Sequence, residues 1–173
     1  MEHRGQDIEG SYKEMKEKYP EMIPWLDSMQ ATGGLKDSTL LREGDTKVHY
    51  YYAYAPQPTG KTAVICHGYT DNAIRMFMIA RIYNQVYGYN IIVPDMPHAG
   101  YSEPNHISMG YYESQIARKL AASAQNIFGN DTTKVEIAVH GISMGAATTL
   151  MTVGDDAVDK ELNIKCAVAD CSY

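Results

Sequence analysis

The sequence predicts an α/β fold in which a mostly parallel sheet carries helices on both faces. Short β-branched and apolar runs have the length and composition of buried strands, and they cover residues 62–66, 91–94, 134–140 and 164–169. Amphipathic segments at 72–87 and 111–128 separate several of these runs, and this alternation is typical of a parallel sheet. The third observation is a glycine-flanked serine, Ser143, at the junction between a predicted strand and a predicted helix.

The N-terminal part is predicted to be helical, and we divide the chain into a helical segment at 1–36 and an α/β core at 37–173. Ser11 and Glu14 have the spacing of a capping box, which predicts a helix that begins near Ser11 and ends at Pro20. A second amphipathic piece follows, and the Gly33-Gly34 pair ends it.

The elements of the core follow in order from a strand at 48–54, where Val48, Tyr50, Tyr52 and Tyr54 are expected to share one face. The helix at 72–87 is expected to bury apolar residues at helical spacing, namely Ile74, Phe77, Met78, Ile82 and Val86. The helix at 111–128 is expected to bury Ile116, Leu120 and Ile127. The strand at 164–169 has no later strand in the sequence to cover its free side, and such an edge predicts possible self-association.

The length and composition of the chain indicate one globular domain with a hydrophobic core of ordinary size. The chain has 173 residues, of which 45% are hydrophobic and 21% charged. A formal net charge of -6 argues against nucleic acid or an anionic membrane surface as a partner. No run approaches the ~18 apolar residues of a membrane span, and the first residues lack a signal peptide's apolar region. We therefore expect a cytoplasmic protein, or a secreted or periplasmic one if a leader was removed.

The cysteines indicate neither a disulfide framework nor a metal site. Cys66, Cys166 and Cys171 do not have zinc-ligand spacing, and all lie in or beside strand-like runs. Reduced and buried thiols are therefore expected at these positions, with no metal bound.

The segment Gly141-Ile142-Ser143-Met144-Gly145 is a G-x-S-x-G pattern between a predicted strand and a predicted helix. In this nucleophile-elbow arrangement a sharp turn lifts the serine hydroxyl above the edge of the sheet. Side chains at Gly141 or Gly145 would collide with the neighbouring strand or helix, and the serine itself must hold a strained backbone conformation. Ser143 is therefore the candidate nucleophile.

A His-Gly pair, His67-Gly68, follows the predicted strand 62–66 and supplies the second half of the candidate site. Carboxyl ends of parallel strands meet at one edge, so the backbone N–H of Tyr69 is expected beside that of Met144, forming an oxyanion hole. We expect His67 to bond to nearby backbone rather than transfer a proton, and Asp95 to hold its own loop through backbone N–H groups. His140 is expected to be a satisfied core histidine.

These motifs resemble the α/β-hydrolase superfamily. The sequences HGYTDN at 67–72 and HGISMGA at 140–146 are most similar to its serine aminopeptidase-like or lysophospholipase-like branch. The resemblance covers essentially the whole chain but only the first half to two-thirds of such a protein. It implies a serine nucleophile, an oxyanion hole, an acyl-enzyme formed from a small-molecule acyl or peptide substrate, and no cofactor.

The sequence departs from this family in two places. The loop Asp95-Met96-Pro97-His98-Ala99-Gly100 differs from the family's form, so no role beyond support carries over to it. The family's triad acid and histidine follow the serine, but no histidine follows Ser143 here, and Asp170 matches a different family position. We therefore expect a C-terminally incomplete α/β-hydrolase fold, with the cap and last strands missing and little turnover by the chain alone.

Two further interpretations remain open from the sequence. The chain could be a non-catalytic α/β-hydrolase-like binding module that keeps the elbow as scaffold. Alternatively, another polypeptide could complete the enzyme by supplying the missing strands and the histidine.

Overall fold

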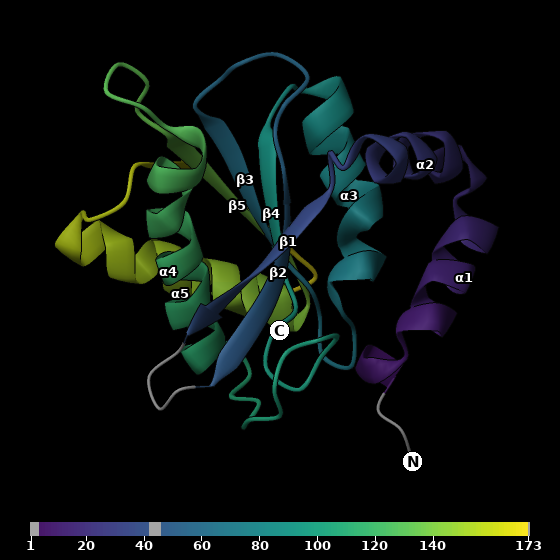
Figure 1. The fold of residues 1–173 in the computed structure, drawn as a ribbon. Coiled ribbons are helices and arrows are strands. Elements are labelled where there is room, and N and C mark those ends of the chain that lie inside the picture. Colours follow the sequence, from purple (N-terminus) through teal and green to yellow (C-terminus); the bar gives the residue numbers. More distant parts are fainter. Residues whose placement is uncertain (1–3, 42–45, 173) are drawn as a thin grey trace.

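The computed structural model describes residues 4–41 and 46–172, and within them the strands form one six-stranded sheet in the order β1-β2-β4-β3-β5-β6 (Figure 1). The strands are β1 (Lys36–Leu41), β2 (Lys47–Ala53), β3 (Lys61–Cys66), β4 (Asn90–Pro94), β5 (Glu136–Ile142) and β6 (Ile164–Asp170). The α-helices are α1 (Ile8–Lys18), α2 (Ile23–Thr32), α3 (Phe77–Arg81), α4 (Tyr111–Phe128) and α5 (Met144–Asp159). Short helical turns are η1 (Arg4–Gln6), η2 (Pro20–Met22), η3 (Ala73–Met76) and η4 (Ile82–Val86).

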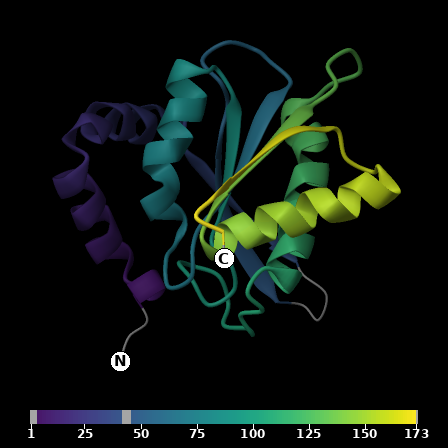
Figure 2. The same cartoon turned by 180° about the vertical axis from the view of Figure 1, so that it is seen from behind.

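The sheet is mostly parallel, as the sequence predicted. Strands β4, β3, β5 and β6 run parallel to one another, whereas β2 is antiparallel to both β1 and β4. Helices α1, α2 and α3 cover one face, and α4 and α5 cover the other (Figures 1 and 2). Separate apolar clusters fill the space between the sheet and each helical layer. No helix in the described part of the chain is long and apolar enough to cross a membrane.

The antiparallel edge of the sheet differs from the expectation. Strand β1 was not predicted, because most of its residues are exposed and its apolar residues do not alternate. In β2, Val48 and Tyr50 are buried against α4, but Tyr54 lies beyond the strand and is 50% exposed. The opposite face of β2 is buried as well, so this strand is enclosed on both sides.

The predicted helix at 72–87 is a composite of η3, α3 and η4, and its inner face was partly wrong. Ile82 and Val86 are 39% and 65% exposed. The cause is the π-type turn η4, whose wider turn rotates the following residues away from the face that α3 presents. Asn84 turns inward instead, and its side-chain amide donates 3.0 Å hydrogen bonds to the carbonyls of Tyr54 and Tyr89.

Helix α1 begins earlier than the sequence predicted. Asp7 is its N-cap, and its carboxylate accepts a 2.8 Å hydrogen bond from the N–H of Gly10. Ser11 therefore lies inside the helix, where it is fully buried and donates its hydroxyl to the carbonyl of Asp7 at 2.6 Å. The capping box predicted at Ser11 does not form.

The cysteine prediction holds for Cys66 and is wrong for the other two. Cys66 is buried in β3, but Cys166 and Cys171 are exposed. The reason is the position of β6, which pairs only with β5 in the described residues and lies outermost in the sheet (Figure 2). Burial raises the pKa of the Cys66 thiol to about 12, because the thiolate would be poorly solvated there.

Thiol alkylation should separate the cysteines. We expect iodoacetamide at mildly alkaline pH to modify the exposed Cys166 and Cys171 in the folded chain and to spare the buried Cys66, because the thiolate is the reactive form. Cys171 should react more slowly than Cys166, since the hydrogen bond to Asp170 raises the pKa of its thiol. Intact mass measured against time, with and without denaturant, reports the number of modified thiols. Modification of Cys66 at the rate of the other two without denaturant would contradict the buried position of β3.

Candidate active site

Ser143 occupies a sharp turn between β5 and α5. Its backbone has φ 54° and ψ −116°, a positive-φ conformation outside the left-handed helical region and rare for a residue with a side chain. The N–H of Ser143 donates to the carbonyl of Asp170 at 2.8 Å, and its own carbonyl accepts from Ala146 and Ala147 in the first turn of α5. The serine is thus held at the end of a central strand and at the N-terminus of a 16-residue helix, where the helix dipole favours negative charge.

The glycines on either side of Ser143 allow close backbone contacts. A Cβ atom on Gly141 would lie 1.8 Å from the carbonyl oxygen of Gly145. A Cβ atom on Gly145 would lie 2.1 Å from the carbonyl oxygen of Cys66 and 2.8 Å from that of His67. The obstacles are backbone atoms that cannot rotate away, so the elbow requires glycine at both positions.

The segment His67–Asn72, here called the oxyanion loop, follows β3 and lies against the elbow. A Cβ atom on Gly68 would lie 3.5 Å from the Cβ of Ser143. Tyr69 follows Gly68 directly and Met144 follows Ser143, so the structure brings both predicted oxyanion residues to the same edge of the sheet. The Tyr69 side chain is 50% exposed, whereas Met144 is buried.

Both ring nitrogens of His67 bond to backbone. The Nδ1 atom lies 2.7 Å from the carbonyl oxygen of Gly68, and Nε2 accepts from the N–H of Met96 at 2.8 Å. This pattern fixes a neutral ring with its proton on Nδ1. His67 therefore joins the oxyanion loop to the loop after β4, and its lone pair is not available to a serine proton.

Asp95 begins the loop after β4 and is completely buried. One carboxylate oxygen accepts from the N–H of Ala73 at 2.8 Å; the other accepts from the N–H of Tyr101 at 3.2 Å and lies 2.8 Å from Nδ1 of His49. Asp95 thus holds its own loop, as the sequence indicated, and also ties it to β2 and η3. The His49 contact had no signal in the sequence.

The third histidine with described ring contacts is His140, which differs from the satisfied core residue that the sequence predicted. Its Nδ1 lies 3.1 Å from the hydroxyl of Tyr83, but its Nε2 is buried and has no hydrogen-bond partner among the described residues. Burial lowers the pKa of His140, and the Asp170 carboxylate partly offsets this effect. The ring contacts of His49, His67 and His140 are all to groups other than Ser143.

An open cavity of about 600 Å³ lies beside the oxyanion loop, lined by Tyr69, His98, Asn105, His106, Ile107 and Met109. The buried Glu113 shapes one wall, because its carboxylate accepts from Ser108 and from the N–H of Gly110 at 2.9 Å. Sequence reasoning missed Glu113, although an acidic residue three positions after a helix-capping glycine is a recognisable signal.

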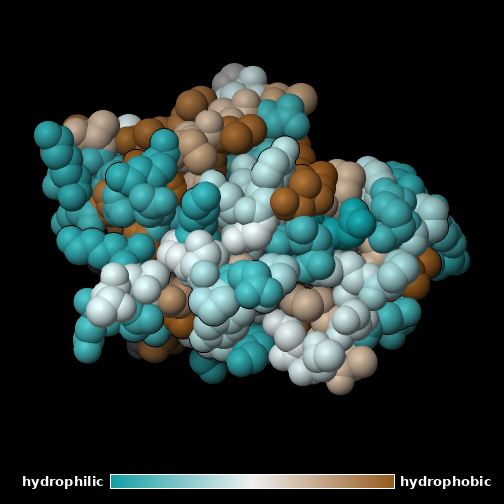
Figure 3. Space-filling view, turned by 90° about the horizontal axis from the view of Figure 1, so that it is seen from above, coloured by the Kyte–Doolittle hydropathy of each residue, from teal (hydrophilic) through white to brown (hydrophobic). Residues whose placement is uncertain are grey.

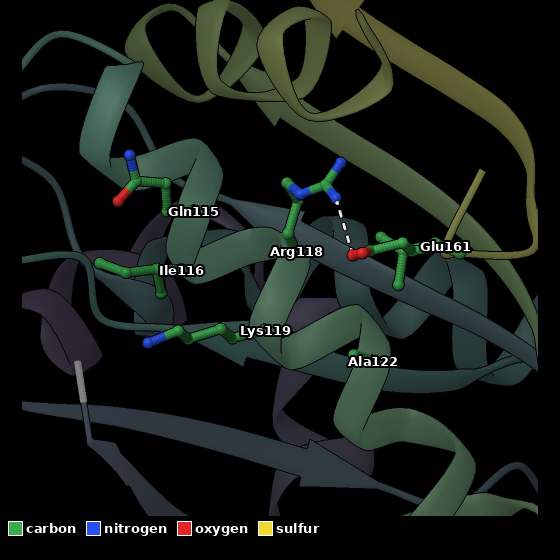
Figure 4. Close-up of a pocket in the computed structure, with 7 residues that line it drawn as sticks. Gln115, Ile116, Arg118, Lys119, Ala122 and Glu161 are labelled. Carbon is green, nitrogen blue, oxygen red and sulfur yellow. Dashed lines mark hydrogen bonds and ion pairs between the residues drawn. The ribbon is translucent and has the colours of Figure 1, made fainter. Parts of the chain in front are cut away.

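Other surfaces lie away from Ser143. A cavity of about 320 Å³ on α4 is lined in part by Arg118, which pairs with Glu161 at 3.2 Å (Figure 4). Arg118 also contacts Asp159, at 2.5 Å. The opposite end of the sheet, where the parallel strands begin, has mixed hydrophilic and apolar residues (Figure 3). Groups of His, Cys, Asp and Glu that could hold a metal ion are absent from the residues that the structure describes.

Comparisons with known proteins agree with this architecture. No protein-family model matches the chain. The uncharacterized protein YqkD of Bacillus subtilis is 30% identical over 122 residues, which are 70% of this chain and 38% of that protein.

Solved structures show the fold. The Pyrococcus furiosus esterase Pf2001 superposes with a TM-score of 0.64 and 24% identity, over 80% of this chain and 49% of that one. An alpha-beta hydrolase from Vibrio vulnificus superposes with a TM-score of 0.66 and 22% identity, over 87% of this chain and 50% of that one. A thioesterase domain from the curacin biosynthetic pathway superposes with a TM-score of 0.55 and 16% identity, over 78% of this chain and 43% of that one.

The chain has the α/β-hydrolase fold, as the sequence predicted. It spans about half the length of these solved structures and 38% of YqkD. The serine aminopeptidase-like or lysophospholipase-like branch stays a prediction.

Substitution of two glycines in α5 tests the elbow contacts. We expect Gly145→Ala to lower the free energy of unfolding by about 3 kcal/mol, because the new methyl group overlaps the β3 backbone. Gly154→Ala is the matched control in the same helix, where a Cβ meets nothing within 4 Å. It should raise the free energy of unfolding by about 0.5–1 kcal/mol, since alanine favours helix. Urea unfolding followed by circular dichroism measures the free energy of unfolding of both variants. An equal change in the two variants would contradict the close approach of Gly145 to the β3 backbone.

Proposed function

We propose that this chain carries the nucleophile and the oxyanion hole of a serine hydrolase that cleaves an ester, thioester or amide. The observation that supports this most is the strained Ser143 at the N-terminus of α5, with Gly68 of the oxyanion loop placed so that an added Cβ would meet its side chain. Strained backbone at such a junction persists when the surrounding structure imposes it, and it is common at catalytic sites.

The proposed reaction proceeds through an acyl-enzyme. The Ser143 hydroxyl oxygen attacks the substrate carbonyl carbon while a histidine takes the hydroxyl proton. The resulting oxyanion accepts hydrogen bonds from the backbone N–H groups of Tyr69 and Met144, and the leaving group departs with the proton that the histidine returns. Water then attacks the acyl carbon by the same route, which releases the acid and restores Ser143. The scheme requires no cofactor.

We propose that the histidine and its carboxylate partner come from residues that this sequence does not contain. All six histidines of the sequence precede Ser143, whereas the triad histidine of the family that the motifs resemble follows the serine. The rings of His49, His67 and His140 also have partners other than Ser143. The half-length match to solved α/β-hydrolases supports this view. The 600 Å³ cavity beside Tyr69 is the proposed position for a small acyl or peptide substrate.

Labelling with a fluorophosphonate tests the nucleophile. Without its base, Ser143 should react slowly but selectively, because oxyanion stabilisation alone retains about 10³–10⁴-fold rate enhancement in serine enzymes that lack a triad residue. Peptide mapping should place the adduct on Ser143. Ser143→Ala should abolish labelling and Ser123→Ala, on α4, should not.

The labelling experiment has two outcomes that would change the proposal. Absence of any Ser143 adduct after prolonged incubation would favour the non-catalytic binding module. Rapid stoichiometric labelling would show that a base is present within this chain, which contradicts the external histidine.

Chemical rescue tests the missing base separately. We expect added imidazole to accelerate hydrolysis of a small activated ester by the chain, because a diffusible base can take the Ser143 proton. The measurement is the initial rate against imidazole concentration, with Ser143→Ala as the control. An equal slope for both proteins would mean that imidazole attacks the ester directly, and would contradict a role for Ser143.

A further inference from the structure

The oxyanion loop is bonded to the N-terminus of the chain through Asn72. This residue is completely buried, and its side-chain amide donates to the carbonyl of Gly5 at 3.1 Å and to the hydroxyl of Ser11 at 2.8 Å. Its side-chain carbonyl accepts from the N–H of Arg75 at 3.4 Å. Asn72 lies three residues after Tyr69, so these bonds fix the far end of the segment that carries the proposed oxyanion N–H.

Gly5 lies between two loops of the candidate site. A Cβ atom on Gly5 would lie 2.5 Å from the carbonyl oxygen of Asp71, so the backbone of η1 rests directly on the oxyanion loop. The Gly5 carbonyl also accepts from the N–H of Gly100, in the loop after β4, at 2.7 Å. Figure 1 shows η1, in purple, at the same end of the molecule as these loops.

An ion-pair chain joins α1 to the same loop a second time. The guanidinium of Arg75 pairs with Glu14 of α1, and its Nε lies 3.1 Å from the carboxylate of Asp71. The Arg75 side chain is only 12% exposed, so solvent screens these contacts less than it screens a surface pair.

The oxyanion loop needs such support because its backbone is strained. Thr70, directly after Tyr69, has φ 63°, which is unfavourable for a β-branched residue. Within the loop, the N–H of Asp71 donates to the carbonyl of Gly68 at 3.2 Å, which closes a tight turn around Tyr69. A strained turn keeps its direction only while its surroundings impose it, and an oxyanion hole depends on that direction.

We propose that η1 and α1 form a positioning element for the oxyanion hole, in which Gly5 and Ser11 act through Asn72 to fix the N–H of Tyr69. This inference rests on the function proposed for Ser143. Gly5 and Ser11 are positioning residues, because their described contacts are to the loops rather than to the site of reaction. Apolar packing of Tyr12 and Met15 holds α1 on α3 independently, so the polar contacts can be removed while the helix stays in place.

Ser11→Ala tests the inference with little disturbance of packing. It removes the hydroxyl that accepts from Asn72, and Ser123→Ala removes a comparable hydroxyl of α4 that donates to a helix carbonyl at 2.8 Å. We expect Ser11→Ala to lower the maximal rate of Ser143 phosphonylation about 10- to 100-fold, as displaced oxyanion donors do. The half-saturating probe concentration should stay unchanged, because the loop acts on bond formation rather than on probe binding.

Hydrogen exchange gives a readout that does not depend on reactivity. Amides of residues 67–72 should exchange faster in Ser11→Ala than in Ser123→Ala, and amides of β5 should exchange alike in the two. Gly5→Ala, which forces η1 off Asp71, should reproduce both effects. Thermal unfolding of all three variants identifies any general loss of fold.

The outcomes separate the two proposals. If the unaltered chain labels at Ser143, and Ser11→Ala and Gly5→Ala label at its rate with unchanged exchange at 67–72, the positioning role is overturned and the proposed function stands. If the unaltered chain does not label at Ser143, the proposed function is overturned. The role of η1 and α1 in positioning an oxyanion hole is then overturned as well. A lower maximal rate with faster loop exchange, in variants that remain folded, supports the inference.

Discussion

The candidate site depends on direct backbone contact between the first turn of α5 and the end of β3. Gly145 approaches the carbonyl of Cys66 so closely that no side chain fits between them. This contact places Ser143 beside Gly68, because it brings the residues that follow β3 and β5 to the same edge of the sheet. Close packing of backbone on backbone is rigid, because neither partner has a rotamer that could relieve a change. The position of the candidate nucleophile is therefore a property of the core rather than of a surface loop.

Buried polar groups extend this rigidity to the loops around Ser143. Asp95 and Asn72 are both inaccessible to solvent, and their bonds reach β2, η3, α1 and the N-terminal turn. A buried carboxylate or amide that lost its partners would be costly, so each of these residues holds its neighbours in a single arrangement. Segments far apart in the sequence are thereby fixed around one edge of the sheet.

The sequence was sufficient for the parallel strands, for α4 and for the elbow, because their patterns are local. Buried strands have apolar runs, and a serine between two glycines directly after such a run is typical of a sharp strand-to-helix turn. The sequence was insufficient where the outcome depended on distant partners. Strand β1 is stabilised by pairing with β2 rather than by its own composition, and the π turn at η4 has no apolar period of its own. The hydrogen bonds between Asn72 and the residues Gly5 and Ser11 span more than 60 residues of sequence, so no local pattern predicts them. The exposed Cys166 and Cys171 follow from the outermost position of β6, which periodicity cannot assign.

Four residues with positive φ lie at one edge of the sheet. Thr70, His98, Ser143 and Cys171 all have positive φ and all lie just beyond the end of a parallel strand. Glycine at such a position would relax the chain, but it would also let the loop sample other conformations. Thermal stability and a single fixed loop geometry therefore make opposite demands on the same few residues. A substitution that stabilises this edge therefore also changes which conformations are open to the loops around the proposed site.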